Sequence, residues 1–483
     1  MSSALNRCLA GVSKIRVVMK FGGTSIADQH CVNNVAGIVV NHAKKGFEVV
    51  VVVSALNGVT DQLLEASEKA KHRSLNEVLE ILSTIEKRHL ALAKEAIGDD
   101  ILRKEATKTV RVNLEELRKV LTGISYLGEA TPRSKDYVLS FGERLSAPII
   151  CGALRDHGLK AQYYTGGEAG IITDSNFGEA LPIMKITKDR VQEVIGSSLK
   201  AGNTPVISGF IATTEDGSIT TLGRGGSDYT AVIMGVALES NEVWFWTDSD
   251  GLMTADPKIE PLAKTIPEIS FQEAIEMAIF GAKRMHPRAL EPAIQEGIPV
   301  RIRNVFKPDA PGTLITEEKK VKSEGVVKAL TLFANVALIT VEGVGMVGIP
   351  GTAAKVFETL GRNGINILMI SQSSSEANIS FIIPRDKMAK TVTALEKDLL
   401  GPSIIREVKA EKDVCVISAV GAGMRGTPGI AARIFGAIAR KNVNIRMIAQ
   451  GSSELNISFV VSEKDGKEAL RALHQEFTLG NLD

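Results

Sequence analysis

The first 315 residues alternate short apolar runs with longer amphipathic segments. Four apolar runs are rich in β-branched or aromatic residues and predict β-strands: 15–19, 49–53, 205–208 and 243–247. The run Val49–Val53 consists of five valines without polar alternation, which is typical of a parallel strand buried on both faces. The sequence therefore predicts a sheet whose central strands run parallel.

Between these runs, apolar residues recur at helical spacing. Residues 75–85 and 110–121 place Leu, Val or Ile three or four positions apart, as one face of an amphipathic helix does. This alternation of strands and helices predicts an α/β sandwich on a mainly parallel sheet. Ligands of such folds bind beyond the carboxyl ends of the strands, so the loops that follow strands are the candidate sites.

The last third of the chain contains an internal duplication. Residues 345–357 match 423–435, and residues 366–381 match 444–459, both at an offset of 78 residues. Each copy has the pattern of a strand, a Gly/Pro turn, a helix, a strand, a polar turn and a strand, which predicts a ferredoxin-like βαββαβ unit. The pair is either a module for oligomerisation or a pair of small-molecule sensors, and one pair can be both.

A charged segment separates the two regions. Residues 317–324 carry six charges and Gly325 follows, which predicts a solvated linker. The sequence therefore predicts an α/β domain at 14–315, a linker at 316–325, and two duplicated domains at 326–408 and 409–483.

Composition narrows the functions that this chain can have. With 57 Lys and Arg against 56 Asp and Glu the net charge is +1, whereas nucleic acids and anionic membranes usually meet strongly basic surfaces. We expect neither as a partner, although a local basic pocket is compatible with this balance. The four cysteines are far apart and the histidines lack ligand spacing, so no metal site is expected. No apolar run approaches the length of a membrane span and no signal-peptide pattern is present, so we expect a cytoplasmic protein.

The first candidate motif, Lys20-Phe-Gly-Gly-Thr-Ser25, directly follows a predicted strand. Gly22 and Gly23 let the backbone approach a phosphate, and Lys20 adds a charge for a transferring phosphoryl group. A Gly-Gly turn after a strand is also found where no ligand binds. The motif indicates a phosphate site only in combination with others.

A second motif at 220–228 contains three glycines around Arg224, and Ser227 and Asp228 begin an apolar helix. Such a loop offers helix N-terminal amides, a bidentate guanidinium and a carboxylate. An N-capped helix after a flexible loop is the structural alternative, but capping explains only Ser227 or Asp228 and leaves Arg224 unexplained. We favour a binding loop.

Three weaker motifs complete the set: Ser140-Phe-Gly-Glu-Arg144 inside a helical pattern, Trp246-Thr-Asp-Ser-Asp-Gly251 after a strand, and Phe280-Gly-Ala-Lys283 at a helix end. A glycine inside a helix costs about 1 kcal/mol relative to alanine, so Gly142 needs either a conformational reason or a ligand close to Glu143. Glycine loops with lysines, and without a Cys/His pair, point to phosphoryl transfer, which needs mainly positioning and charge neutralisation.

In this order and spacing, the five motifs resemble those of the aspartate kinases of the amino acid kinase superfamily. The duplicated copies resemble their paired ACT domains, and the resemblance covers nearly all of the chain after the first dozen residues. It implies a three-layer kinase domain followed by two ACT domains. It also implies ATP-dependent phosphorylation of the side-chain carboxylate of L-aspartate to 4-phospho-L-aspartate, the first step towards lysine, threonine and methionine.

The resemblance also implies a role for each matching residue. Lys20 and Asp228 would be catalytic: Lys20 would stabilise the γ-phosphate, and Asp228 would orient Lys20. Aspartate would contact four residues, with its ammonium on Glu143 and its α-carboxylate on Arg224: Ser54, Thr60, Glu143 and Arg224. ATP would contact nine residues: Lys20, Gly22, Gly23, Thr247, Asp248, Met253, Lys258, Lys283 and Arg284. Mg²⁺ would be held mainly by ATP oxygens and water, without a protein metal cage.

Three of these positions depart from the family pattern. Met253 stands where the family commonly has tyrosine, Lys258 where it has arginine, and Arg284 where it has a small apolar residue. We expect ATP to remain the phosphoryl donor with an altered set of contacts, since a methionine can still cover a base.

For the ACT copies, the resemblance implies feedback inhibition by an end-product amino acid, with threonine favoured and lysine as the alternative. The effector candidates are Met346 and Gln372 in the first copy and Met424 and Gln450 in the second. A homodimer or higher oligomer through the ACT domains is expected.

Two alternative functions are weighed against this one. A kinase for glutamate, N-acetylglutamate or a nucleotide would lack the ACT pair and the 140–143 motif. A catalytically inactive amino-acid sensor would not need Lys20, Arg224, Asp228 and Lys283. Because no residue follows Asp483, no fused homoserine dehydrogenase is expected.

Overall fold

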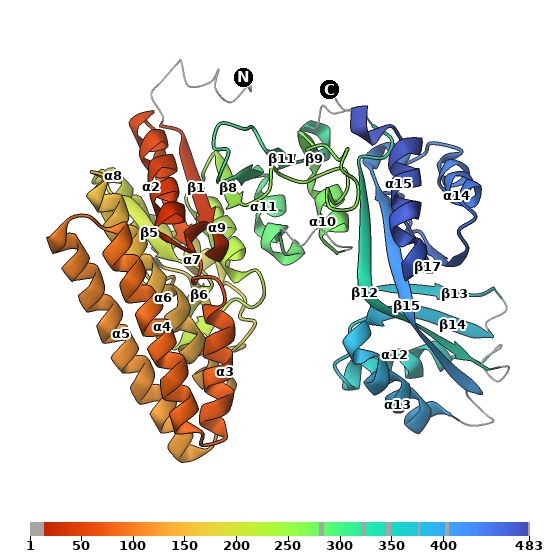
Figure 1. Cartoon of the computed structure of the whole chain (residues 1–483), viewed down its shortest axis with the longest axis horizontal. Helices are drawn as coiled ribbons and strands as arrows, with labels where there is room; N and C mark the ends of the chain where they lie inside the picture. Colours follow the sequence, from red (N-terminus) through yellow and green to blue (C-terminus); the bar gives the residue numbers. More distant parts are fainter. Residues whose placement is uncertain are drawn as a thin grey trace. The chain divides into compact units, whose positions relative to one another are not determined.

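The computed structural model describes residues 14–279, 285–320, 325–343, 349–374, 377–400 and 405–481. The chain divides into two compact units, Met1–Gly251 with Arg284–Val321 and Leu252–Lys283 with Lys322–Asp483. Figure 1 shows the helices and strands of each unit, which are described separately below.

The first unit is built on a mainly parallel sheet. Its strands are β1 (Arg16–Phe21), β2 (Glu48–Val53), β3 (Ala161–Tyr164), β5 (Thr204–Ser208), β8 (Glu242–Thr247), β10 (Val300–Asn304) and β11 (Thr313–Thr316). They lie in the order β3-β5-β2-β1-β8-β10-β11, and only β11 is antiparallel to its neighbour β10. The four predicted strands and their parallel arrangement are confirmed. A small second sheet holds β4 (Ile172–Thr173), β6 (Ile211–Thr214) and β7 (Ile219–Thr221).

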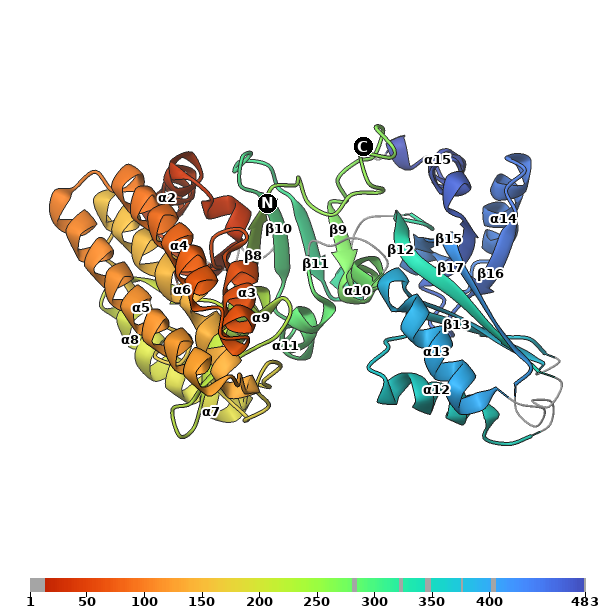
Figure 2. The same cartoon turned by 60° about the horizontal axis from the view of Figure 1, so that its bottom comes forward.

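Helices cover both faces of this sheet, as Figures 1 and 2 show. One group consists of α2 (Gln29–Lys44), α3 (Val59–Lys71), α4 (Leu75–Ala96), α5 (Asp100–Leu127) and α6 (Pro132–Asp156). The other side carries α7 (Met184–Val191), α8 (Ser197–Lys200), α9 (Gly226–Ala237) and α11 (Glu291–Glu296). The valines at 49, 51 and 53 belong to the core shared with α2–α6, whereas Val50 and Val52, buried as completely, point to the other face. The predicted burial of this parallel strand on both faces is therefore confirmed.

Helix α9 lies directly on the sheet. A Cβ atom at Gly235 would come within 2.4 Å of Val243 Cγ2 and 4.0 Å of Val18 Cγ2. Every residue of α9 is buried, so its N-terminus is fixed relative to the ends of the central strands.

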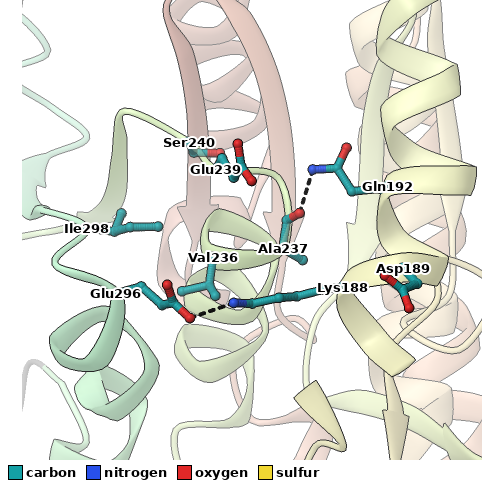
Figure 3. Close-up of a pocket in the computed structure, with 9 residues that line it drawn as sticks. All are labelled: Lys188, Asp189, Gln192, Val236, Ala237, Glu239, Ser240, Glu296 and Ile298. Carbon is teal, nitrogen blue, oxygen red and sulfur yellow. Dashed lines mark hydrogen bonds and ion pairs between the residues drawn. The ribbon is translucent and has the colours of Figure 1, made fainter. Parts of the chain in front are cut away.

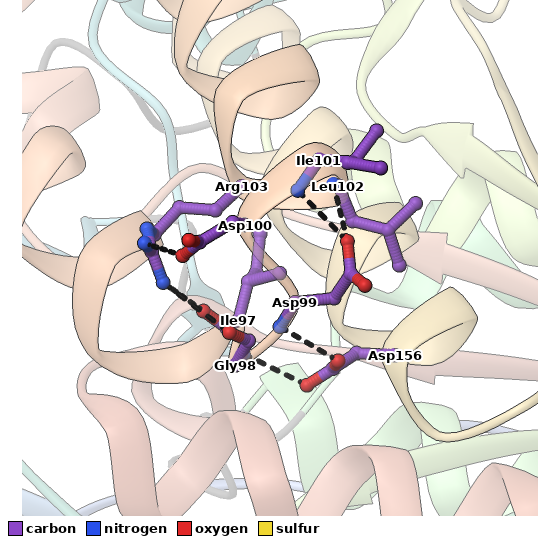
Figure 4. A network of polar contacts seen from close by, with 8 residues as sticks. All are labelled: Ile97, Gly98, Asp99, Asp100, Ile101, Leu102, Arg103 and Asp156. Carbon is purple, nitrogen blue, oxygen red and sulfur yellow. Dashed lines mark hydrogen bonds and ion pairs between the residues drawn. The ribbon is translucent and has the colours of Figure 1, made fainter.

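The start of α5 is fixed by polar contacts (Figure 4). The Asp99 carboxylate accepts hydrogen bonds from the backbone N–H groups of Ile101 and Leu102 and so caps the helix. The Asp156 carboxylate, at the end of α6, accepts from the N–H groups of Gly98 and Asp99 at 2.8 and 3.0 Å. The turn between α4 and α5 is thereby tied to α6.

The second unit contains one antiparallel sheet with helices on it. The strands are β12 (Ala329–Glu342), β13 (Met369–Gln372), β14 (Asn378–Pro384), β15 (Glu407–Val420), β16 (Ile445–Ala449) and β17 (Asn456–Ser462), in the order β13-β14-β12-β15-β17-β16. The helices are α12 (Thr352–Arg362), α13 (Met388–Leu399), α14 (Ile430–Arg440) and α15 (Gly466–Glu476). The order of elements repeats between the copies, which confirms the predicted duplication.

The two copies share their longest strands. The first half of β12, Ala329–Phe333, pairs with Val416–Val420, and its second half, Leu338–Glu342, pairs with Glu407–Glu411. Val327 and Leu330 belong to the core of the second copy, whereas Ile405 and Val408 pack on the core of the first. The second copy therefore takes its last strand from residues that precede the first copy, so no single boundary near residue 408 separates them.

Residues 252–283 also belong to the second unit, although the sequence places them within the 14–315 domain. They contain β9 (Glu268–Ser270) and α10 (Phe271–Ile279). Ala255 and Ile259 are buried in the core of the second copy, and the Ile259 carbonyl accepts a hydrogen bond from Arg471 Nε at 2.9 Å.

Among the helices that the structure describes, none is both long enough and apolar enough to cross a membrane.

Candidate functional site

The central strands of the first unit end together at one edge of the sheet. Phe21 of β1 is in register with Val53 of β2 and with Trp246 of β8. The N–H of Ser54 donates to the Phe21 carbonyl at 3.2 Å, and the N–H of Gly209 donates to the Val53 carbonyl at 2.9 Å. The loops after β1, β2, β5 and β8 thus begin side by side, as parallel pairing requires.

Lys20 and Asp228 form an ion pair at this edge. Lys20 Nζ lies 2.6 Å from Asp228 Oδ1, and the two side chains are only 16% and 10% exposed. Lys20 comes from β1 and Asp228 from the first turn of α9, so the pair joins the strand to the helix that covers it. The pairing places the Asp228 carboxylate beside the Lys20 ammonium group.

The two glycines after Lys20 allow a close contact between loops. A Cβ at Gly23 would lie 2.5 Å from the Ala55 carbonyl oxygen and 3.0 Å from the Asn57 nitrogen. Any side chain at this position would push the loop after β1 away from the loop after β2. A Cβ at Gly22 would lie 3.5 Å from Lys20 Nζ, which places this backbone directly beside the ammonium group.

The N-terminus of α9 faces the same edge. Gly225 is the N-cap in a left-handed conformation with φ of 70°, and none of the described side chains caps the helix. Ser227 and Asp228 therefore lie within the first turn of α9 and are not its N-cap. A Cβ at Gly226 would lie 2.5 Å from the Phe210 ring, so this glycine lets the loop after β5 reach α9. The first N–H groups of α9 lack helical partners and are suited to an anion.

Glu143 is a buried carboxylate on α6. The residue is 3% exposed, and its Oε2 atom has no hydrogen-bond partner among the residues that the structure describes. Burial raises the pKa of Glu143 to about 8, although backbone N–H groups at Ala55 and Glu143 and the charge of Lys20 act to lower it. A buried carboxylate with an unpaired oxygen is suited to bind a ligand cation such as an ammonium group.

The Gly142 position is explained by packing. A Cβ there would come within 2.7 Å of Ala55 Cβ, so glycine lets α6 lie against the loop after β2. The Ser146 hydroxyl donates to the Ser54 carbonyl at 2.8 Å and strengthens the same contact. This close approach brings Glu143 to the edge where Lys20 and Ser54 lie.

Asp136 is a buried residue that sequence reasoning missed. It is 1% exposed and accepts hydrogen bonds from the Thr221 N–H and hydroxyl, both at 2.8 Å, and from the Gly178 N–H at 2.9 Å. Burial raises the pKa of Asp136 above its ordinary value, although these hydrogen bonds act to lower it. Asp136 precedes Glu143 by seven residues and so lies on the same face of α6. The seven-residue spacing from Glu143 was the sequence signal that could have identified Asp136. Through its bonds to Thr221, Asp136 anchors the start of the loop that carries Arg224.

The remaining predicted residues of the first unit lie near this edge or on its surface. Thr60 is half-buried in the first turn of α3, and Thr247 ends β8, where its hydroxyl donates to Asp248 Oδ1 at 3.2 Å. Asp248 and Arg224 are exposed. The structure therefore gathers Lys20, Gly22, Gly23, Ser54, Glu143 and Asp228 around the strand ends.

Two predicted nucleotide-side residues lie in the second unit. Met253 is half-buried and its sulfur accepts a hydrogen bond from the Thr265 hydroxyl at 3.4 Å, while Lys258 is exposed. Lys283, Arg284 and Met346 lie outside the described residues.

The effector candidates of the second ACT copy lie together. Met424 and Gln450 line one surface hollow with Glu454, Ile457 and the turn 426–431. Met424 is 4% exposed, and the Gly426 N–H donates to Glu454 Oε2 at 2.7 Å, which ties the turn to the opposite wall. Gln372 ends β13 and is exposed at the corresponding place in the first copy.

Another hollow of the first unit lies away from these residues. Figure 3 shows its lining at the C-terminal end of α9, where Lys188 pairs with Glu296 and Gln192 Nε2 donates to the Ala237 carbonyl at 2.7 Å. Asp228 lies at the opposite end of the same helix, so this hollow contains none of the predicted site residues. Within the described ranges, no group of three or more His, Cys, Asp or Glu side chains could hold a metal ion.

Comparison with known proteins identifies the family. The model of the amino acid kinase family matches residues 16–304, and the ACT domain model matches 339–399 and 417–477. The chain belongs to the amino acid kinase family. The family match includes residues 252–279, which fold with the ACT domains.

Similar proteins of known sequence or structure are aspartokinases. Aspartokinase 2 of Arabidopsis thaliana, a chloroplastic protein, is 35% identical over 96% of this chain and 84% of its own. The bifunctional aspartokinase/homoserine dehydrogenase 1 of Zea mays is 34% identical over 96% of this chain, and this kinase spans about half (50%) of that protein. Aspartokinase III of E. coli, solved with aspartate and ADP, is 30% identical with a TM-score of 0.79 over 96% of this chain and all (100%) of its own.

Replacement of Glu143 tests the burial of this carboxylate. Burial raises the pKa of Glu143 to about 8 in the folded chain, whereas the unfolded chain has the ordinary pKa of 4.5. This group therefore favours folding most below the unfolded value, and its contribution declines as the pH rises towards the folded value. Glu143→Gln should gain about 1–3 kcal/mol of stability relative to the unchanged chain between pH 5 and pH 8, measured by urea unfolding without ligand. Glu65→Gln, on the exposed face of α3, is the control, and parallel curves for Glu143→Gln would refute the assignment.

Proposed function

We propose that this kinase transfers the γ-phosphate of ATP to the side-chain carboxylate of L-aspartate and forms 4-phospho-L-aspartate. The observation that carries the proposal is the meeting of a cation, Lys20, with a buried unpaired carboxylate, Glu143, at the ends of the central strands. An α-amino acid needs an anion for its ammonium and a cation for its α-carboxylate, and Glu143 and Arg224 supply these charges. The aspartokinases that match nearly the whole chain support the same substrate.

The reaction needs little covalent participation by the protein. An oxygen of the aspartate side-chain carboxylate forms a bond to the γ-phosphorus, while the bond from that phosphorus to the bridging oxygen breaks and ADP leaves with the electron pair. Lys20 offsets the negative charge on the transferring group, and Asp228 holds the Lys20 ammonium in place. Gly22 and Gly23 admit the phosphates close to the backbone. Mg²⁺ would neutralise phosphate charge and be held mainly by nucleotide oxygens and water.

A bound ammonium group would offset the free-energy cost of burying the charged Glu143 carboxylate. Without a cation, burial favours the neutral acid, and a bound ammonium group favours the carboxylate. Substrate binding near neutral pH would therefore release a proton from Glu143. The nucleotide contacts proposed for Thr247, Asp248, Met253, Lys258, Lys283 and Arg284 complete the ATP side.

Replacement of Lys20 tests the kinase activity. In an assay that traps the acyl phosphate with hydroxylamine, the unchanged chain should give signal that depends on both aspartate and Mg·ATP. Lys20→Met should lower kcat by about 10²-fold or more, because charge stabilisation of the transition state is lost. Lys45→Met, an exposed lysine in the turn after α2, is the control. The proposal fails if the folded, unchanged chain gives no aspartate-dependent signal.

For regulation, we propose that an end-product amino acid inhibits the enzyme by binding at the ACT copies, with threonine preferred and lysine second. The Met424–Gln450 hollow offers an amide, a carboxylate at Glu454 and a Gly/Pro turn that begins α14, which suit a small zwitterion. E. coli aspartokinase III was solved with lysine, so lysine is a real competitor.

Assays with added threonine, lysine or methionine test this preference. Threonine should inhibit at the lowest concentration, and Gln450→Ala should raise its half-inhibition concentration about tenfold, because a direct polar contact is lost. Gln372→Ala is the matched variant in the first copy and shows which copy binds. Inhibition by lysine with no response to threonine would contradict the preference.

We also propose a homo-oligomer formed through the ACT domains. The edge strands β13 and β16 carry exposed apolar residues at equivalent positions, Ile370 at 46% and Ile448 at 44% exposure. Exposed strand edges with apolar side chains favour pairing with another chain.

Sedimentation measures this oligomer directly. The unchanged chain should sediment as a dimer or larger species at micromolar concentration, and Ile370→Lys with Ile448→Lys should weaken the assembly because it adds like charges to the edges. A monomer at assay concentration would contradict the proposal.

A further inference from the structure

Arg303, near the end of β10, stacks against two tryptophan rings of β8. Its guanidinium carbon lies 4.7 Å from the centroid of the Trp244 ring and 4.7 Å from the centroid of the Trp246 ring. Arg303 and Trp246 are partners in the parallel pair of β8 and β10, so both side chains lie on the same face of the sheet. The chain has two tryptophans, and Arg303 contacts both of them.

This guanidinium is partly shielded from water. Trp244 and Trp246 are 7% and 1% exposed, and the His42 ring of α2 packs edge-on against Trp244, with ring centroids 5.0 Å apart. Burial lowers the pKa of Arg303 to about 10, so the guanidinium keeps its charge near neutral pH. Because cation–π contacts are stronger where the cation is desolvated, Arg303 joins β10 firmly to the end of β8.

Arg303 also holds the loop that follows β10. Its Nη2 donates to the Pro308 carbonyl at 2.6 Å and to the Ala310 carbonyl at 3.3 Å. In the same loop, the Val305 N–H donates to the Thr247 carbonyl at 2.8 Å. The loop after β10 is therefore fixed to the end of β8 by both side-chain and backbone contacts.

The loop after β8 is held by the residue next to Arg303. Asn304 is 5% exposed; its Nδ2 donates to Asp250 Oδ1, and its Oδ1 accepts the Phe306 N–H at 2.8 Å. Lys307 Nζ lies 2.7 Å from the other oxygen of Asp250. The hydrogen bonds from Lys307 and Asn304 lower the pKa of Asp250, so it is a carboxylate with both oxygens held near neutral pH.

The segment 247–250 is thus fixed at both ends. Trp246 precedes it and is held by Arg303, and Asp250 ends it and is held by Asn304. Trp246 also contacts the 20–25 motif, because the Phe21 ring stacks on it at 6.0 Å between centroids and the Ser25 hydroxyl donates to its carbonyl at 3.4 Å. A shift of Trp246 would therefore move the segment 247–250 relative to the loop that carries the candidate phosphate contacts.

We propose that Arg303 and Asn304 are positioning residues that hold the segment 247–250 in the place required for nucleotide binding. This inference rests on the proposed kinase function, in which Thr247 and Asp248 contact ATP. Arg303 and Asn304 act through Trp246 and Asp250 and do not themselves contact the nucleotide. Their effect is confined to the nucleotide, because Glu143 on α6, proposed to bind the aspartate ammonium group, lies outside this set of contacts.

Arg303→Lys in the full chain is the primary test. Lysine keeps the charge but loses the planar group that stacks on the rings and bonds two carbonyls. The variant should raise the KM for ATP about three- to tenfold, with the KM for aspartate unchanged and kcat within about twofold. Asn304→Ala, which leaves the contacts of Arg303 with the rings in place, is the second variant and should change the same constant in the same direction.

Tryptophan fluorescence gives a direct readout, since both tryptophans of the chain belong to this cluster. Titration of the unchanged chain with Mg·ADP should change the emission and saturate. Arg303→Lys should shift the emission of the free protein to longer wavelength, because water reaches the rings more easily. The variant should also raise the Kd for Mg·ADP about three- to tenfold.

Arg16→Lys is the matched control. Arg16 is another half-buried arginine, at the opposite end of the sheet, where it pairs with Glu48 at 2.8 Å. This variant should lower the midpoint of urea unfolding but leave the KM for ATP and the Kd for Mg·ADP unchanged. The control thereby separates a loss of stability from a loss of nucleotide positioning.

The outcomes separate the inference from the proposed function. If Arg303→Lys and Asn304→Ala fold and keep the nucleotide constants of the unchanged chain, the inference is wrong and the proposed function stands. A parallel rise in the KM for ATP and the KM for aspartate also overturns the inference, because it indicates a general disturbance. If the unchanged chain binds Mg·ADP but makes no acyl phosphate, the proposed function fails and the Kd values still decide the inference. If Arg303→Lys does not fold, Asn304→Ala decides it.

Discussion

The register between the central parallel strands is the constraint on which the candidate site depends. Phe21, Val53 and Trp246 are in register, so β1, β2 and β8 end at the same edge of the sheet. The loops that follow these strands therefore begin close to one another. Two of the resulting contacts are possible only without a Cβ, at Gly23 and at Gly226. The register in turn requires strands that are buried on both faces, which the valines of β2 provide.

Charge is concentrated at this edge in a way that whole-chain balance conceals. The net charge of +1 results from nearly equal numbers of acids and bases, yet Lys20 is largely shielded from water beside Asp228, and Glu143 is buried with one oxygen unpaired. In such surroundings interactions between charges are stronger than on the surface. A small ligand of mixed charge can therefore be recognised by few groups.

Local patterns predicted the elements well because burial sets their periodicity. The strands around Val49–Val53 and Val243–Thr247, the helices at 75–85 and 110–121, and the duplication were all readable from spacing alone. The alternative in which Ser227 or Asp228 caps α9 does not match the structure, because Gly225 stands at the N-cap in a left-handed conformation. Asp136 was missed because one acid in an amphipathic helix resembles any solvated acid until its partners from distant loops are known.

The pairing of distant segments was the least readable feature. Residues 252–283 carry kinase-family motifs, so their sequence associates them with the kinase domain, whereas their apolar residues Ala255 and Ile259 are buried with the second ACT copy. The shared strands were equally hidden, since a strand pattern shows that a segment pairs but not with what. The 14 residues of β12 and of β15 each run without interruption through both copies. The first copy is thus an insertion between two parts of the second. The two copies share one sheet, and β12 and β15 extend through both of them. A change in the twist of β12 or β15 within one copy would therefore reach the other copy through the same two strands.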